Sequence, residues 1–283
     1  MKGIIDLLLH RSERVAFRKL ASQRAAFLKR PEEERTLLLA TRQLENRHVG
    51  QRCFLLGAGS SISRQDLSKL EGEIVISVSN TFVHPLFSTI GPRYHVLPPM
   101  LASHGKQYSD EKFITWLRDM EQKTHNAEMV LHIGDREMIE KNDLFGAQVI
   151  HWVEYAAWDG DFGLPIDLAH IPKIWSVSET AVTLAVYLGF SEIYLVGFDH
   201  DWFNGTLVYF YDHTKEHALR PDQANLDYVD AEFQMRRHAE IFRKYKYLYS
   251  IRKNIYNANA DKNHYMDVFP KVDFDEICAA PKL

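Results

Sequence analysis

Histidines and carboxylates gather after residue 198 of the 283-residue chain, in a segment dense in aromatic side chains. Asp199 and Asp201 form an Asp-x-Asp pair directly after an apolar run, an arrangement typical of sites that hold a divalent ion, Mg²⁺ or Mn²⁺, against a diphosphate. His213 and His217 follow, and histidine is the side chain best suited to removing a hydroxyl proton near neutral pH. We expect a lid over residues 200–228 that carries the general base.

Other interpretations of these residues stay open. The segment is also compatible with a solvated loop whose histidines are incidental. His200, beside two carboxylates, is a third candidate base and could instead be a metal ligand or a structural partner. Asp159 and Asp161 form a second Asp-x-Asp, which lies in a Gly- and Trp-rich stretch and is predicted to be a turn.

A glycine turn is the second chemical signal. The apolar run 52–57 ends in five small residues, Gly57, Ala58, Gly59, Ser60 and Ser61. Glycines let the backbone approach a ligand closely, and successive N–H groups before a helix favour anionic oxygen, so the turn favours a nucleotide. Ile62 stands where a dinucleotide motif has its third glycine, so a dinucleotide cofactor is not expected. The competing interpretation is a turn whose glycines serve packing alone.

Polar residues follow two further apolar runs. Asn80 comes after the run 73–79, and Ser178 comes after the run 171–177. An Asn at the end of a strand offers both a donor and an acceptor to a ribose, a base or a sugar hydroxyl, although it also suits a turn or a cap. Because ligands of parallel sheets bind at the carboxyl ends of strands, we expect these residues to lie at one edge with the glycine turn.

The elements that position these residues alternate between strand and helix from about residue 51. Short β-rich runs lie at 52–57, 73–79, 94–97, 128–133, 147–153, 192–197 and 254–259. Helical patterns lie at 110–123, 178–189 and 227–249, the second with Ser178 as its predicted N-cap and Gly189 as its stop. The alternation predicts an α/β fold with a Rossmann-like, doubly wound and mostly parallel sheet.

Charge divides the chain in two. Residues 1–30 carry eight basic and two acidic side chains, a balance of +6, so the formal total of -4 leaves -10 for the rest. We predict an N-terminal helical arm over 1–50 and a nucleotide-sugar-binding domain over 51–283. The basic and apolar residues of 1–30 suit an anionic membrane surface, or a helix packed on its own domain. The acidic body argues against a nucleic-acid partner.

Cysteine usage and hydropathy indicate the compartment. Cys53 and Cys278 lie far apart in apolar stretches, so a disulfide framework is not expected and a reducing compartment is favoured. The longest apolar run, 181–190, is about half of the roughly 20 residues that cross a bilayer. We therefore expect a cytoplasmic protein, with peripheral attachment to the membrane through the basic arm as one of the two interpretations of residues 1–30.

An ordered set of strings carries a resemblance. FLLGAGSSI, SVSNTF, SETAVTLAVYLGFSEIYLVGFDHDWFNG and IYNANADKNHYMDVFPKVDF span roughly residues 52–275. Together they resemble the bacterial CMP-sialic-acid sialyltransferases encoded in lipooligosaccharide loci. They are also similar to the broader group named for the archaeal 6-hydroxymethylpterin diphosphokinase, which includes motility accessory factor-like proteins.

The resemblance implies a GT-A-type single sheet with a lid and assigns roles to residues. It implies a nucleotide bound at the glycine turn and Asn80, and donor contacts from Ser176 and Ser178. Tyr209, after Asn204-Gly205, matches a lid tyrosine that hydrogen-bonds the leaving phosphate. His213 or His217 is the nearest counterpart of the catalytic histidine. The donor-binding set is then Gly57, Ala58, Gly59, Ser60, Ser61, Asn80, Ser176, Ser178, Asp199 and Asn204.

Three departures from the family pattern put the donor sugar in doubt. Pro98-Pro99 replaces an Asn-Pro, and Asp201-Trp202 stands where a second phosphate-binding tyrosine is expected. The family needs no metal, whereas Asp199 and Asp201 could bind one.

The expected activity is transfer of a sugar from a nucleotide donor, a CMP-activated ulosonic acid of sialic type, to a hydroxyl of a bacterial surface glycan or lipid-linked acceptor. The alternatives are an ATP- and magnesium-dependent diphosphokinase acting on a pterin alcohol, and a nucleotide-binding protein without catalysis.

Overall fold

The fold is built on seven parallel strands. In the computed structural model, the described residues are 18, 21–22, 24–100, 111–156, 166–200, 209–211, 231–260 and 266–280. Their strands form one sheet in the order β5-β4-β3-β2-β1-β6-β7. The strands are β1 (Arg52–Leu56), β2 (Val75–Val78), β3 (Tyr94–Val96), β4 (Glu128–His132), β5 (Ile150–Val153), β6 (Glu192–Val196) and β7 (Ile255–Asn257).

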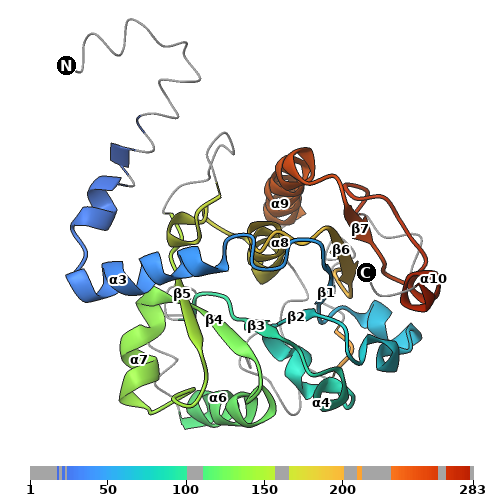
Figure 1. Cartoon of the computed structure of the whole chain (residues 1–283), viewed down its shortest axis with the longest axis horizontal. Coiled ribbons are helices and arrows are strands. Elements are labelled where there is room, and N and C mark those ends of the chain that lie inside the picture. Colours follow the sequence, from blue (N-terminus) through green and yellow to red (C-terminus); the bar gives the residue numbers. More distant parts are fainter. Residues whose placement is uncertain are drawn as a thin grey trace, which may run out of the picture.

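Helices cover both faces of this sheet (Figure 1). They are α3 (Glu32–Ala40), α4 (Phe87–Ile90), α6 (Glu111–Lys123), α7 (Arg136–Lys141), α8 (Val177–Tyr187), α9 (Ala231–Ile251) and α10 (Phe274–Ala279). In Figure 1 the sheet runs from β5 on the left to β7 on the right, with α8 and α9 above it and α4 and α6 below. The predicted Rossmann-like α/β fold is confirmed.

Alternating residues of β1 face two of the three apolar cores among the described residues. On β1, Cys53 and Leu55 face the core that contains α8 and α9, whereas Phe54 and Leu56 face the core beneath α4 and α10. All five residues of β1 are buried, as expected for the central strand of a parallel sheet covered on both faces. Burial on both faces explains why the strands read as near-continuous apolar runs in the sequence.

The order of the strands creates one reversal point. The chain adds β2 to β5 on one side of β1 and then returns to add β6 and β7 on the other side. Leu56 of β1 pairs with Ser77 of β2 on one side and with Val196 of β6 on the other. Ligands of open α/β sheets bind at the carboxyl ends of strands next to such a reversal. The turns after β1 and β6 are therefore the place to look for the site.

Every predicted strand contains an observed one. The apolar run 171–177, which was expected to be a strand that ends before Ser178, is not a strand. Ile171 makes an isolated bridge with Tyr155, and α8 already begins at Val177. Pro172 has no N–H to give to a ladder, and the hydroxyl of Ser176 accepts from the Ser178 amide. Ser176, rather than the predicted Ser178, is thus the N-cap of α8. Gly189 follows the helix with φ +81° and ends it as predicted.

The segment 30–50 packs against the sheet, whereas most of the described residues before it are exposed. Leu44 is fully buried in the core that contains α8 and α9, and Leu38 of α3 is fully buried in a third core, which includes Phe113 and Leu117 of α6. Arg30 forms an ion pair with Glu154, which follows β5. The boundary at residue 50 stays a prediction. Among the described residues, no helix is both long enough and apolar enough to cross a membrane.

Candidate functional site

The turns after β1 and β6 interlock at the reversal point of the sheet. The Gly57 amide donates to the carbonyl of Val196 at 2.8 Å, and the Gly59 amide donates to the carbonyl of Gly197 at 2.9 Å. These bonds continue the pairing of β1 with β6 beyond the strand ends. They hold the glycine turn directly against the turn that carries Asp199.

Glycine is required at both points of contact. A Cβ on Gly57 would lie 2.4 Å from the carbonyl oxygen of Gly197, and one on Gly59 would lie 2.4 Å from Oδ2 of Asp199. Real Cβ atoms do not approach other atoms so closely, so any side chain here would push the two turns apart. The glycines therefore serve the packing of the two turns, which was the competing interpretation. Their role toward a nucleotide stays a prediction.

Asp199 is a buried residue whose side chain accepts hydrogen bonds from the glycine turn. It is 3% exposed, and its Oδ2 accepts from the Ser61 amide at 2.9 Å while its Oδ1 accepts from the Ser61 hydroxyl at 2.5 Å. Both carboxylate oxygens thus face Ser61. This contact fixes the start of the 3-10 turn at Ser60–Arg64 and places the Asp199 side chain directly behind it.

The segment Tyr209–Tyr211 lies against the same turn. Tyr209 pairs with Gly59 in an antiparallel bridge, and the Phe210 amide donates to the carbonyl of Ala58 at 3.2 Å. The rings of Tyr209 and Tyr211 stack with centroids 5.2 Å apart. Tyr209 was predicted to belong to a lid over the site, and its contact with Gly59 puts it beside the glycine turn.

Asn80, after β2, connects this segment to α6. Its side-chain amide donates to the hydroxyl of Tyr211 at 2.7 Å, and its carbonyl oxygen accepts from the indole N–H of Trp116 at 3.0 Å. Burial raises the pKa of Tyr211, so its hydroxyl stays protonated at neutral pH. Ser79, just before Asn80, has φ +49°, a conformation rare outside glycine. Non-glycine residues held in this conformation concentrate at functional sites.

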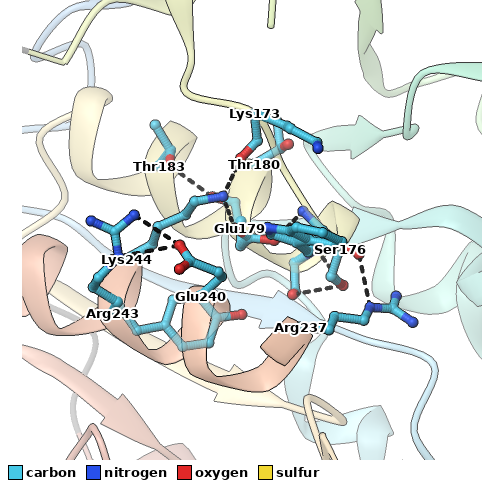
Figure 2. A network of polar contacts seen from close by, with 12 residues as sticks. Lys173, Ser176, Glu179, Thr180, Thr183, Arg237, Glu240, Arg243 and Lys244 are labelled. Carbon is cyan, nitrogen blue, oxygen red and sulfur yellow. Dashed lines mark hydrogen bonds and ion pairs between the residues drawn. The ribbon is translucent and has the colours of Figure 1, made fainter. Parts of the chain in front are cut away.

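The two predicted donor-contacting serines lie at the start of α8, Ser176 as its N-cap and Ser178 in its first turn; Figure 2 labels Ser176. The Ser178 hydroxyl donates to the Ser176 hydroxyl at 2.9 Å, and Oε2 of Glu179 accepts from the amides of Trp175 and Ser176, each at 2.7 Å. This is a complete capping box. The Glu179 carboxylate thus occupies these amides, and the two serine hydroxyls contact each other.

His200 follows Asp199 with φ +51° and is 5% exposed. Its Nε2 lies 3.1 Å from the hydroxyl of Tyr245, and its ring packs edge-on against Phe242 and His238. Of its three suggested roles, these contacts match that of a structural partner.

Four of the predicted site residues lie outside the described residues. They are Asp201, Asn204, His213 and His217, and their roles as metal ligand, donor contact and general base stay predictions. The described residues contain no group of three or more His, Cys, Asp or Glu side chains that could hold a metal ion. Asp199, the described half of the Asp-x-Asp pair, directs both oxygens at Ser61. We therefore derive no step through a metal.

Comparison with solved structures finds a likeness in fold to sialyltransferases. It is similar to the sialyltransferase CstII from Campylobacter jejuni in complex with the substrate analogue cytidine-5'-monophosphate, with 16% identity over 79% of this chain and 85% of that chain and a TM-score of 0.45.

It is also similar to the sialyltransferase CST-II in complex with a trisaccharide acceptor and CMP, with 15% identity, 78% and 86% coverage and a TM-score of 0.42. No family model matches the chain, and no curated protein matches it. At this level of likeness, the function rests on the chain's own residues.

A cavity of about 420 Å³ lies at the opposite, amino edge of the sheet, lined among others by His48, Glu73 and Arg93. Its charged groups are paired within the protein: Arg93 with Glu128 at 2.6 Å, and Glu73 with Arg52 at 2.9 Å. None of the residues predicted to bind a ligand lines it. The candidate site is the carboxyl edge, where the predicted residues meet.

Three residues of this edge were not predicted as site residues. Tyr211 stood in the aromatic-rich segment but was not distinguished from its neighbours. Trp116 lies in an ordinary amphipathic helix, and Lys244 lies in a long helix rich in charged residues. Only the contact between Trp116 and Asn80, and that between Lys244 and Glu179, distinguishes them. Both contacts are tertiary and leave no local signal in the sequence.

Proposed function

We propose that the chain is a glycosyltransferase that moves a sugar from a nucleotide donor, a CMP-activated ulosonic acid of sialic type, to a hydroxyl of a bacterial surface glycan or lipid-linked acceptor. One observation carries the proposal: Gly57–Ser61, Asn80, Asp199 and Tyr209 converge at the reversal point of the sheet. The resemblance of the sequence to sialyltransferases supplies the choice of donor.

The proposed reaction is a direct displacement. A histidine of the lid, His213 or His217, takes the proton of the acceptor hydroxyl while the acceptor oxygen bonds to the anomeric carbon of the donor sugar. The bond between that carbon and the phosphate oxygen breaks, and CMP leaves with the electron pair. The hydroxyl of Tyr209 donates to the phosphate as its charge develops.

Two features support a nucleotide donor with a single phosphate over ATP. Asp199 takes the Ser61 amide and places a buried carboxylate behind the glycine turn. Because the Ser61 amide already donates to Asp199, the turn has one amide fewer to offer to the phosphates of a triphosphate. Asn80 and the serines of the α8 turn are neutral donors and acceptors, which suit a ribose, a base or sugar hydroxyls better than a triphosphate. The pterin diphosphokinase alternative is accordingly not favoured.

Residues 1–30 supply the proposed route to a lipid-linked acceptor. Their charge balance is +6, and Leu28, within the described part, has 56% of its surface exposed. Basic residues interleaved with exposed apolar ones bind anionic membrane surfaces peripherally. The arm would hold a cytoplasmic enzyme at the membrane where such acceptors are assembled.

The experiment is a donor screen with the purified full chain. CMP-sialic acid, CMP-Kdo, UDP-sugars and GDP-sugars are each incubated with and without EDTA, and released nucleotide is measured together with transfer to lipooligosaccharide acceptors. We expect CMP release from a CMP-linked sugar. ATP with a pterin alcohol and magnesium forms the opposing arm.

Each arm has a distinct outcome. Turnover confined to ATP would replace the proposal by the diphosphokinase. Nucleotide binding without turnover of any donor would favour a binding protein. Neither turnover nor a thermal shift with any nucleotide would remove the proposal.

A further inference from the structure

One helix, α9, contacts two separate turns of the candidate site. Figure 2 shows Lys244 of α9 reaching the turn before α8, where its ammonium group meets Glu179 and the carbonyl of Lys173. Six residues earlier in the same helix, His238 contacts the turn after β6. The two turns are far apart in the sequence, and α9 packs against α8.

The contact at the α8 turn is a buried ion pair. Lys244 and Glu179 have side chains that are 3% and 2% exposed, and Nζ lies 2.5 Å from Oε1. The other carboxylate oxygen of Glu179 holds the amides of Trp175 and Ser176. Arg237, also from α9, donates to the carbonyl of Trp175 at 3.1 Å. The backbone that carries Ser176 is therefore held by α9 through Glu179 and Trp175.

The contact at the β6 turn is made through His200. Nε2 of the His238 ring lies 3.0 Å from the carbonyl oxygen of His200, and its Nδ1 lies 2.7 Å from that of Gln234. The hydroxyl of Tyr245, which is fully buried, lies 3.1 Å from Nε2 of His200. His200 is held in the left-handed region with φ +51°, so these contacts stabilise a conformation that a free chain seldom adopts. They fix the backbone next to Asp199.

We propose that Lys244 is a positioning residue, and that α9 sets the spacing between the serine turn before α8 and the Asp199 turn after β6. A buried ion pair contributes little net stability compared with apolar residues of the same size, but it fixes geometry where its hydrogen bonds are satisfied. Here the geometry concerns two turns that a ligand at the carboxyl edge would contact together. The inference rests on the proposed function only for its nucleotide-binding readout.

The test removes the ion pair and keeps the helix cap. In the double variant K244M/E179Q, no buried charge is left unpaired, and glutamine at this position still caps the amides of Trp175 and Ser176. Hydrogen exchange of the backbone amides in 173–178 is measured by mass spectrometry, together with CMP affinity and thermal unfolding. We expect about tenfold faster exchange in 173–178 and about tenfold weaker CMP binding, with cooperative unfolding retained.

The matched control lies on the same helix. Arg243 and Glu240 form an ion pair of 2.8 Å on α9 with side chains 41% and 27% exposed, and R243Q/E240Q removes it while Lys244, Glu179 and the residues of both turns are kept. The control should match the wild type in exchange and in affinity, because exposed pairs contribute little. Unchanged exchange in K244M/E179Q, or an equal change in the control, would overturn the inference.

A second variant tests the other turn. H238L should speed exchange of the amides in 198–200 and leave those in 173–176 unchanged, because Lys244 still holds the α8 turn. Faster exchange along the whole of α9 in H238L would mean that the helix is merely destabilised and would contradict the assignment. If the wild type binds no CMP, the proposed function fails, while the exchange measurements still decide whether α9 positions the two turns.

Discussion

The two edges of the sheet are held together by different chemistry. At the amino edge, the carboxylate of Glu128 binds the guanidinium of Arg47 at 2.8 Å and that of Arg93 at 2.6 Å, and the His151 ring lies 2.7 Å away. At the carboxyl edge, Asn80 contacts the neutral groups of Tyr211 and Trp116, and the buried carboxylates of Asp199 and Glu179 accept from backbone amides.

The contrast between the two edges suggests that the amino edge serves stability and the carboxyl edge serves ligand binding. The charges of the amino edge compensate one another: burial opposes ionisation of Glu128, but the hydrogen bonds from Arg47 and His151 outweigh it and hold its pKa below the ordinary value. At the carboxyl edge, Ser79 and His200 have left-handed conformations, as Asn46, Asp143 and Phe145 do in connections elsewhere in the fold. Strain of that kind persists only where the surrounding structure enforces it. We expect mutations at the first edge to change stability and mutations at the second to change binding.

The largest effect is expected from Glu128→Ala. The substitution leaves Arg47, Arg93 and His151 without their shared carboxylate, so the free energy of unfolding should fall by about 3 kcal/mol in urea titration. CMP affinity should be unchanged in the folded fraction. The control is Asp275→Ala, which removes an exposed ion pair with Lys69 and should cost about 0.5 kcal/mol or less. Equal losses would contradict the comparison.

Gly57→Ala should affect both properties. The added Cβ would lie 2.4 Å from the Gly197 carbonyl oxygen, so the turns must separate, at a cost of about 2 kcal/mol in unfolding free energy. CMP binding should weaken at least about tenfold as the glycine turn shifts. Gly146→Ala is the matched control, since its Cβ meets nothing within 4 Å. A stable Gly57→Ala variant with normal affinity would show that the two turns do not depend on each other.

Acid should lower the free energy of unfolding through two buried histidines, His95 of β3 and His132 of β4. Burial lowers the pKa of His95 to about 3, and burial together with the Arg30 charge lowers that of His132 to about 4. Both folded values lie below the value of about 6.5 expected for an unfolded chain. Their contribution to stability is therefore complete above pH 6.5 and is lost as the pH falls toward 4 and then 3. Each histidine contributes a slope of up to about 1.4 kcal/mol per pH unit.

Urea titrations from pH 7 to pH 4 measure this slope. His132→Gln should flatten it, because the variant has one buried histidine fewer to protonate. A slope that His132→Gln leaves unchanged would contradict the role of burial at this position.

The smallest effect is expected from Tyr211→Phe. The variant loses only the hydroxyl that accepts from Asn80 at 2.7 Å, and a single such bond contributes about 1 kcal/mol. Because Tyr211 orients Asn80 at the proposed nucleotide site, CMP should bind about fivefold more weakly in calorimetry. Tyr256→Phe, on β7, serves as the control. Tighter binding by Tyr211→Phe would mean that Tyr211 competes with the nucleotide for Asn80.

The sequence predicted the sheet well because its strands are buried on both faces. Such strands appear as short apolar runs bounded by turn residues, and the glycine turn after β1 could be placed from that pattern alone. The run 171–177 misled because Ile171, Ile174 and Val177 resemble a strand, while Pro172 and the Ser176 cap decide otherwise. In this run, the missing N–H of Pro172 and the helix cap at Ser176 outweigh the strand-like composition.

The site was less predictable because its contacts join distant segments. Asp199 and Ser61 are separated by 138 positions, and no local pattern distinguishes a carboxylate that holds a turn from one that holds a metal. The same is true of Lys244, whose partner Glu179 lies on another helix. Residue types and strand ends could be predicted from the sequence, whereas the pairing of one side chain with another required the fold.

Equilibrium binding of CMP tests the central claim most directly. Calorimetric titrations compare the wild type with Asn80→Ala at the carboxyl edge and Arg93→Ala at the amino edge. The account predicts that the wild type and Arg93→Ala bind CMP alike and that Asn80→Ala binds it at least about tenfold more weakly. Equal affinity in Asn80→Ala, or a loss confined to Arg93→Ala, would contradict a nucleotide site at the carboxyl edge.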